Sequence, residues 1–224
     1  MGFSVAVIFD LDGTLLDTPL GIVHVVKLTA EQLGLAAPSD AAIRAMIGKP
    51  LQEMFISFGW PASTSEQSLT IFRSLFSEHV VSVASSLVLP GMRRSLEALA
   101  ADHRLGVATS KVLHSAEEIL TAAGLREYFV VVLGADSVAN PKPAPDMALL
   151  AASHLGVSPG SCSVVGDSVH DMQMAVSAGM GAIGVTWGVD TPHDLFAAGA
   201  SLMWEDSTKV PDSLLSQPLT TKEV

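Results

Sequence analysis

Two carboxylates stand one residue apart in the motif "FDLDGT", directly after a short apolar stretch. They are Asp10 and Asp12, and Gly13 and Thr14 follow them with the residue types of a turn. Two like charges at this spacing destabilise the folded chain unless a cation or a hydrogen-bonding partner offsets them. The pair is therefore either a solvated strand end or part of a site, and the rest of the chain must decide between the two.

Three later segments also combine a short apolar run with polar residues at or beyond its end. They read "LGVATSK", "FVVVLGAD" and "CSVVGD", and each apolar run is typical of a buried parallel strand. The polar side chains that follow these runs are Thr109, Ser110, Lys111, Lys142, Asp167 and Asp171. Ligands of a parallel α/β sheet collect outside the carboxyl ends of its strands. We therefore expect these side chains to lie close to the first acidic pair.

Together these residue types meet the needs of phosphoryl transfer. That reaction requires a nucleophile, a proton donor, a cation that neutralises phosphate oxygens, and further donors for the transferring group. Each motif also has a simpler explanation. Asp167 or Ser168 could cap a helix, Thr109 and Ser110 could cap another, and Lys142 could be a solvated loop lysine. Their joint occurrence at consecutive strand ends favours a site.

Helical stretches separate these strands and predict the fold class. They begin near positions 91, 112, 144 and 170, and three of them end at a glycine suited to a left-handed C-cap: Gly124, Gly156 and Gly179. Strand and helix in repeated alternation predict an α/β protein with a Rossmann-like, open parallel sheet and helices on both faces.

The segment from 16 to 84 breaks this alternation. It contains four helical periods with no strand between them, at 19–33, 40–46, 51–58 and 65–83. We predict a small all-helical cap domain here, inserted after the first strand, with residues 1–15 and 85–224 forming the α/β core domain. The loop from Ile47 to Leu51 carries Lys49, and we expect this lysine to reach the substrate.

Composition narrows the partners and the location. The 224 residues are 49% apolar, but Gly, Pro or charge interrupts every run before the ~18 apolar residues that a membrane helix requires. A net charge of −11 argues against nucleic acid as a partner, and an anionic small molecule would need local positive charge. A single cysteine, Cys162, and no basic leader predict a soluble cytoplasmic protein.

The ordered motifs resemble those of the haloacid dehalogenase (HAD) superfamily, in the group with a helical cap after the first strand. The phosphoglycolate phosphatase-like branch is the most similar. The resemblance rests on "DLDGT", on Thr109 within "ATSK", on Lys142 within "PKPAPD" and on "GDSVHD". It implies a HAD-like core and a phosphatase that acts on a small phosphorylated metabolite.

The resemblance also implies a role for each residue at the site. Asp10 would be the nucleophile that forms an aspartyl-phosphate, and Asp12 the general acid and base. Thr109 and Ser110 would bind the phosphoryl oxygens, and Lys142 would offset charge between phosphate and Asp10.

A metal ion follows from the same resemblance. Mg²⁺ would be held by a carboxylate oxygen of Asp10, the backbone carbonyl of Asp12 and Asp167, with Asp171 acting through a water. All-oxygen coordination with retained waters is what Mg²⁺ prefers.

Several activities remain open at this point. The second acid and Asp167 argue against carbon–halogen and phosphonate cleavage, but a sugar-phosphate mutase or an inorganic pyrophosphatase could use the same core. A non-catalytic binding protein on this fold is a more remote alternative. The sequence leaves open which phosphate ester is cleaved and whether the chain is a monomer or a homodimer.

Overall fold

A six-stranded, fully parallel sheet forms the centre of the computed structural model, which describes residues 5–209. Its strands are β1 (Ala6–Phe9), β2 (Arg104–Ala108), β3 (Val131–Leu133), β4 (Cys162–Gly166), β5 (Gly181–Val185) and β6 (Leu202–Trp204). Their order across the sheet is β3-β2-β1-β4-β5-β6. The first four confirm the strands expected from sequence. The other two were not predicted, because Gly181 and Gly184 interrupt the apolar run of β5 and because β6 has only three residues.

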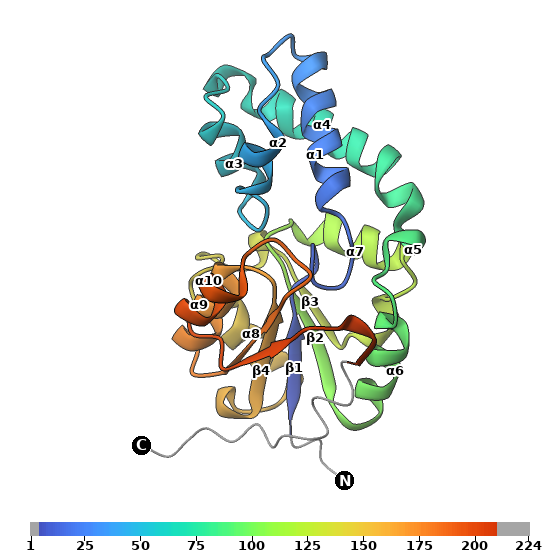
Figure 1. Cartoon of the computed structure of the whole chain (residues 1–224), viewed down its shortest axis with the longest axis vertical. Coiled ribbons are helices and arrows are strands. Elements are labelled where there is room, and N and C mark those ends of the chain that lie inside the picture. The colour runs from blue at the N-terminus through green and yellow to red at the C-terminus, as the bar shows by residue number, and fades with distance from the viewer. Residues whose placement is uncertain (1–4, 210–224) are drawn as a thin grey trace.

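Helices cover both faces of the sheet, as the alternation predicts. Those of the α/β part are α6 (Met92–Asp102), α7 (Leu113–Ala122), α8 (Asp146–Leu155), α9 (Val169–Ser177) and α10 (Pro192–Ala197). Side chains of β1 alternate between two apolar clusters: Phe9 lies in the cluster that contains residues of α6 and α7, and Ile8 in the cluster that contains residues of α8 and α9. Figure 1 shows α6 and α7 on one side of the sheet and α8, α9 and α10 on the other.

The predicted glycine C-caps are confirmed. Gly124, Gly156 and Gly179 have φ angles of 63°, 69° and 68°, in the left-handed region that favours glycine. Within residues 5–209, no helix has both the length and the apolar character that crossing a membrane requires.

The helical insertion lies over the carboxyl ends of the strands (Figure 1). Its helices are α1 (Pro19–Gln32), α2 (Asp40–Arg44), α3 (Leu51–Ser57) and α4 (Ser65–His79). It has its own aromatic packing, in which Phe55 stacks on Trp60 at 4.7 Å between ring centroids and Phe72 meets Phe55 edge-on at 5.9 Å. The helix predicted over 65–83 ends earlier, at His79, where the β-branched residues of the "VVSV" run favour a 3₁₀ turn over a further α-helical turn.

Two antiparallel segments join the insertion to the sheet. Leu16 pairs with Val88, the amide of Asp17 donates to the carbonyl of Leu87 at 2.8 Å, and α5 (Ala84–Leu87) precedes the returning segment. The entry and the exit of the insertion therefore lie side by side. The boundaries at 16 and 84 remain a prediction.

Candidate active site

The first acidic motif follows β1, where the order of the strands along the sheet changes direction. β2 and β3 lie on one side of β1, and β4, β5 and β6 on the other. Asp10 follows β1 and Asp167 follows β4, and the amide of Asp10 donates to the carbonyl of Val165 at 2.8 Å. A crevice between adjacent strands at such a switch point is where open α/β sheets bind ligands.

Three carboxylates and one ammonium group meet in this crevice. Oxygen atoms of Asp10, Asp167 and Asp171 all lie within 4.8 Å of one another. Lys142 places Nζ 2.6 Å from Oδ1 of Asp10 and 2.5 Å from Oδ1 of Asp171. All four side chains are buried. The structure thus brings together residues that the sequence separates by as much as 161 positions, from 10 to 171.

Asp167 is held by hydrogen bonds from two loops. The hydroxyl of Thr14 donates to Oδ1 at 3.1 Å, and the amide of Val189 donates to Oδ2 at 2.9 Å. Gly13 has a φ of 84°, and a Cβ at this position would lie 2.2 Å from Oδ2 of Asp167. Only glycine therefore allows the turn after β1 to approach this carboxylate so closely.

Asp171 lies in the first turn of α9 and has two functions in the local structure. Its Oδ2 accepts hydrogen bonds from the amide of Ser168 at 3.1 Å and from the Ser168 hydroxyl at 2.6 Å, while its Oδ1 faces Lys142. Ser168 in turn accepts from the amide of Asp171, which completes a capping box. Asp171 therefore caps α9, as the helix-cap explanation requires, and it also lies in the carboxylate cluster.

Burial dominates the electrostatics of the cluster. It raises the pKa of Asp10 to about 7, although Lys142 lowers that pKa, and it raises the pKa of Asp167 well above its usual value, with Asp10 and Asp171 adding to the effect. For Lys142, burial alone would lower the pKa, but the charges of Asp10 and Asp171 outweigh burial and raise it. Two of the three acidic groups, Asp10 and Asp171, thus share one cationic partner.

The donor set fits a divalent cation. The cluster holds one ammonium group and three buried carboxylates, so with all four groups ionised its net charge is −2 (three negative charges and one positive). Carboxylate oxygens are the ligands that Mg²⁺ and Ca²⁺ prefer. The cluster of Asp10, Asp167 and Asp171 therefore offers the oxygen ligands that the predicted metal site requires.

Asp12 lies beside this cluster with partners of its own. Its Oδ1 accepts from the hydroxyl of Thr18 at 2.5 Å, and its Oδ2 lies 2.9 Å from Nζ of Lys111. Nζ of Lys111 also lies 4.1 Å from the ring centroid of Phe76 in α4. Lys111 is one of the polar residues expected near the acidic pair, and the structure places it there, although the sequence indicated no role for it. Thr18 carried no comparable signal in the sequence.

The hydroxyl pair after β2 divides its contacts between core and insertion. Thr109 is buried, and its Oγ1 accepts from the amide of Lys111 at 3.3 Å. The hydroxyl of Ser110 donates to the carbonyl of Gly48, in the loop between α2 and α3, at 2.5 Å. Ser110 therefore contacts the insertion directly.

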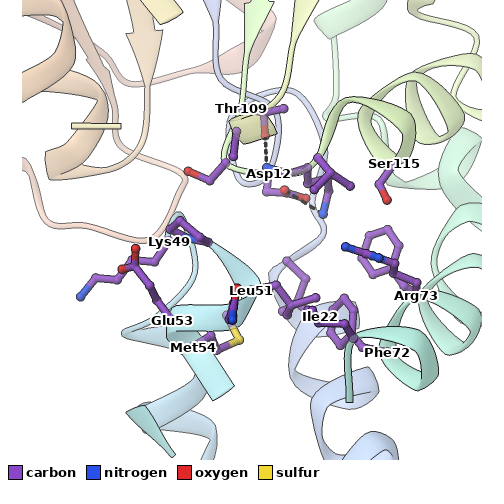
Figure 2. A pocket seen from close by; sticks show the side chains of 18 of the residues that line it. Asp12, Ile22, Lys49, Leu51, Glu53, Met54, Phe72, Arg73, Thr109 and Ser115 are labelled. Carbon is purple, nitrogen blue, oxygen red and sulfur yellow. Dashed lines mark hydrogen bonds and ion pairs between the residues drawn. The ribbon is translucent and has the colours of Figure 1, made fainter. Parts of the chain in front are cut away.

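A cavity of about 770 Å³ opens from these residues towards the insertion. Asp10, Asp12, Thr109 and Ser110 line it on the core side, and the loop with Lys49 lines it on the other. Figure 2 shows the ammonium group of Lys49 pointing away from Asp12 and Thr109. The predicted contact of Lys49 with substrate remains a prediction.

Comparisons with known proteins agree with this arrangement. A model of the haloacid dehalogenase-like hydrolases matches residues 7–185. "Probable phosphatase IndB" of Dickeya dadantii (strain 3937) is 44% identical over 208 residues, covering 91% of this chain and 90% of the relative. Phosphoglycolate phosphatase of Shigella dysenteriae serotype 1 (strain Sd197) is 33% identical over 204 residues, with 81% of each chain covered.

A solved structure of a hydrolase from Pseudomonas syringae superposes with a TM-score of 0.81 at 26% identity, covering 94% of this chain and 97% of the other. The chain belongs to the haloacid dehalogenase-like hydrolases. By homology it is a HAD-type phosphatase and acts on phosphorylated substrates.

Proposed function

We propose that the chain hydrolyses small phosphate monoesters with Mg²⁺ and through an aspartyl-phosphate on Asp10. One observation carries the proposal: the carboxylates of Asp10, Asp167 and Asp171, together with Lys142, form a buried cluster at the switch point of the sheet, and Asp10 also lines the large cavity. A carboxylate nucleophile needs no base to activate it once it is ionised.

Asp10 and Asp167 would hold the metal, with the backbone carbonyl of Asp12 as a further ligand and Asp171 acting through a water. When bound, Mg²⁺ supplies positive charge that stabilises the ionised carboxylates and the phosphate oxygens. Lys142 supplies part of the same charge from the protein itself, because its ammonium group already bridges Asp10 and Asp171.

The reaction would proceed in two displacements. A carboxylate oxygen of Asp10 attacks phosphorus, the bond between phosphorus and the alcohol oxygen breaks, and Asp12 gives its proton to that oxygen. A water then attacks the phosphorus of the aspartyl-phosphate while Asp12 accepts the proton, which releases inorganic phosphate and restores Asp10. Thr109 and Ser110 line the same cavity and would donate hydrogen bonds to the phosphoryl oxygens, for which the Ser110 hydroxyl would first leave the carbonyl of Gly48.

Hydrolysis of p-nitrophenyl phosphate tests the proposal. We expect release of free phosphate that requires added Mg²⁺ and stops with EDTA. A folded, Mg²⁺-loaded protein that releases no phosphate from any ester would overturn the proposal, and so would turnover that EDTA leaves unchanged. Isomerisation of a sugar phosphate without phosphate release would instead indicate the mutase alternative, and preferential cleavage of pyrophosphate would indicate the pyrophosphatase.

Two expectations from the sequence extend this proposal. The cytoplasm remains the expected location, since Cys162 is a buried free thiol and the chain has no second cysteine with which to pair. Phosphoglycolate, which the 33% identical relative is named for, is the first natural ester to assay. The size and lining of the cavity on the insertion side indicate whether phosphoglycolate fits the site better than other esters do.

A further inference from the structure

The cavity above the carboxylate cluster is bounded by contacts between insertion and core. On one side Ser110 donates to the carbonyl of Gly48 at 2.5 Å. On another, Nζ of Lys111 lies 4.1 Å from the ring centroid of Phe76, and the hydroxyl of Ser77 donates to Oε1 of Glu118 at 2.7 Å. The cavity therefore has its volume of about 770 Å³ while the insertion is in contact with the core.

This volume is large for a two-carbon acid. Proteins bury drug-sized ligands in cavities of roughly 300 to 1,000 Å³. The cavity lies in the upper part of that range, so phosphoglycolate would leave much of it to water. The size therefore favours an ester with a larger alcohol.

The wall opposite the carboxylate cluster is mostly apolar. The apolar side chains that line it come from α1, α3 and α4, and they are Ile22, Leu51, Met54, Ile56, Leu69, Phe72 and Phe76. Figure 2 shows Ile22, Leu51, Met54 and Phe72 across the cavity from Asp12 and Thr109. A sugar or a short hydroxy acid would find few hydrogen-bond partners along these apolar side chains, and hydroxyl groups that are desolvated without such a partner are unfavourable. An apolar ring would bury surface there at a gain.

One cation of the insertion points into this cavity. Arg73 on α4 lines it, and in Figure 2 its guanidinium group extends towards the middle of the cavity. In the part of the chain that the structure describes, Arg73 makes no hydrogen bond or ion pair. Guanidinium groups bind carboxylate and carbonyl oxygens through paired donors. Arg73 is therefore free to receive an acceptor oxygen of a ligand.

We propose that the site takes monophosphate esters of apolar, ring-containing alcohols that carry an acceptor oxygen, and that Arg73 binds this oxygen. The inference rests on the phosphatase function proposed above. The phosphoryl group lies at Asp10 and Thr109, the ring lies against Leu51 and Phe72, and the acceptor oxygen reaches α4. Apolar area supplies most of the affinity, and Arg73 selects among alcohols of similar size.

Three esters compared on the wild-type protein with Mg²⁺ test the size and polarity of the alcohol. They are phosphoglycolate, 2-naphthyl phosphate and 6-carboxy-2-naphthyl phosphate. We expect kcat/KM to rise in that order, by about tenfold or more at the first step, which corresponds to one fully buried apolar group. Hydrolysis of phosphoglycolate with the highest kcat/KM would overturn this inference and leave the phosphatase function intact. No turnover of any ester, p-nitrophenyl phosphate included, would overturn both.

Two pairs of variants test the residues. Arg73→Gln is compared with Arg94→Gln, an exposed arginine on α6 outside the cavity, and Leu51→Ala with Leu20→Ala, which removes an exposed leucine of α1. We expect Arg73→Gln to lower the preference for the carboxylated over the plain naphthyl ester by about tenfold, as the loss of a charge-assisted hydrogen bond does. We expect Leu51→Ala to raise KM for both naphthyl esters several-fold.

Arg94→Gln should keep the wild-type preference between the two naphthyl esters, and Leu20→Ala should keep the wild-type KM for both. If the Arg73 and Arg94 variants prefer the carboxylated naphthyl ester to the same extent, Arg73 does not recognise the alcohol. Equal KM in the Leu51 and Leu20 variants would remove the apolar wall. Thermal unfolding midpoints within a few degrees of wild type exclude misfolding as the cause of either loss.

Discussion

The two sides of the cavity hold their polar groups in opposite ways. On the core side, Asp10 faces Lys142, Asp167 accepts from two loops, and Asp171 accepts from Ser168 while facing the same lysine. On the insertion side, Arg73 has no partner within residues 5–209. Reacting groups require fixed positions, because catalysis depends on geometry held before the substrate arrives. A group that recognises variable parts of a substrate gains by keeping its donors unused until binding.

Replacement of the nucleophile should give the largest effect, because it removes the reacting atom itself. We expect Asp10→Asn to lower kcat for p-nitrophenyl phosphate by roughly 10⁴-fold or more, as loss of a nucleophile does in other hydrolases. The variant should remain folded, since it removes one of three crowded, buried carboxylates. Asp17→Asn is the matched control, an exposed aspartate in the segment that enters the insertion. Comparable turnover in both variants would remove Asp10 from this role.

Replacement of the buried lysine should affect stability as well as activity. Lys142→Met leaves Asp10 and Asp171 without their cationic partner, and breaking one side of a buried ion pair costs roughly 3 to 5 kcal/mol. Lys27→Met breaks the exposed pair with Asp40, and its loss should cost far less because solvent screens the two charges. Urea unfolding in EDTA measures both, because chelation prevents bound metal from compensating. Equal losses would contradict the ion-pair explanation.

The core side of the cavity could be predicted from the sequence because its polar residues stand beside the ends of apolar strands. Asp10, Thr109 and Asp167 each directly follow an apolar strand, and parallel strands place their carboxyl ends together. The motif after β1 therefore indicates which groups meet, although not that Thr14 and the amide of Val189 orient Asp167. Thr14 reaches Asp167 because of the turn after β1, and Val189 lies in the loop after β5. The sequence did not predict β5, because glycines interrupt its apolar run.

The insertion side could not be predicted in the same way. Helical periodicity identified α1 to α4 within a few residues, but it does not state how the helices are oriented over the sheet. That orientation decides which of Lys49 and Arg73 points into the cavity. In Figure 2 it is Arg73, while the ammonium group of Lys49 extends away from Asp12. The pairing of Lys111 with both Asp12 and the ring of Phe76 depends on the same docking.

Lys111 joins the two sides, so its replacement should give an intermediate effect. Lys111→Met removes the ion pair with Asp12 and the contact with the Phe76 ring, and we expect kcat/KM to fall by about tenfold, equivalent to ~1.4 kcal/mol. Lys111→Arg keeps the charge and should recover part of the loss. Lys209→Met, at an exposed ion pair with Asp206, is the control. Wild-type kcat/KM in Lys111→Met would show that the core positions Asp12 without this contact.

The smallest effect should come from a contact between the two sides that touches no reacting group. The hydroxyl of Ser77 on α4 donates to Glu118 on α7 at 2.7 Å. Ser77→Ala removes a hydrogen bond of about 0.5 to 1.5 kcal/mol. If this hydrogen bond stabilises the docked position of the insertion when substrate binds, we expect its loss to raise KM roughly two- to fivefold while kcat stays near wild type.

Ser82→Ala provides the comparison for that measurement, because its hydroxyl bonds to the carbonyl of Glu78 within the same segment of the chain. It removes a hydroxyl of the same kind whose hydrogen bond does not reach the core. A rise in KM in the Ser77 variant alone would mean that contacts between insertion and core contribute to binding separately from the chemistry. A fall in kcat in that variant would instead mean that docking of the insertion also sets the geometry of the carboxylate cluster. The two sides of the cavity would then act as one unit in spite of their different construction.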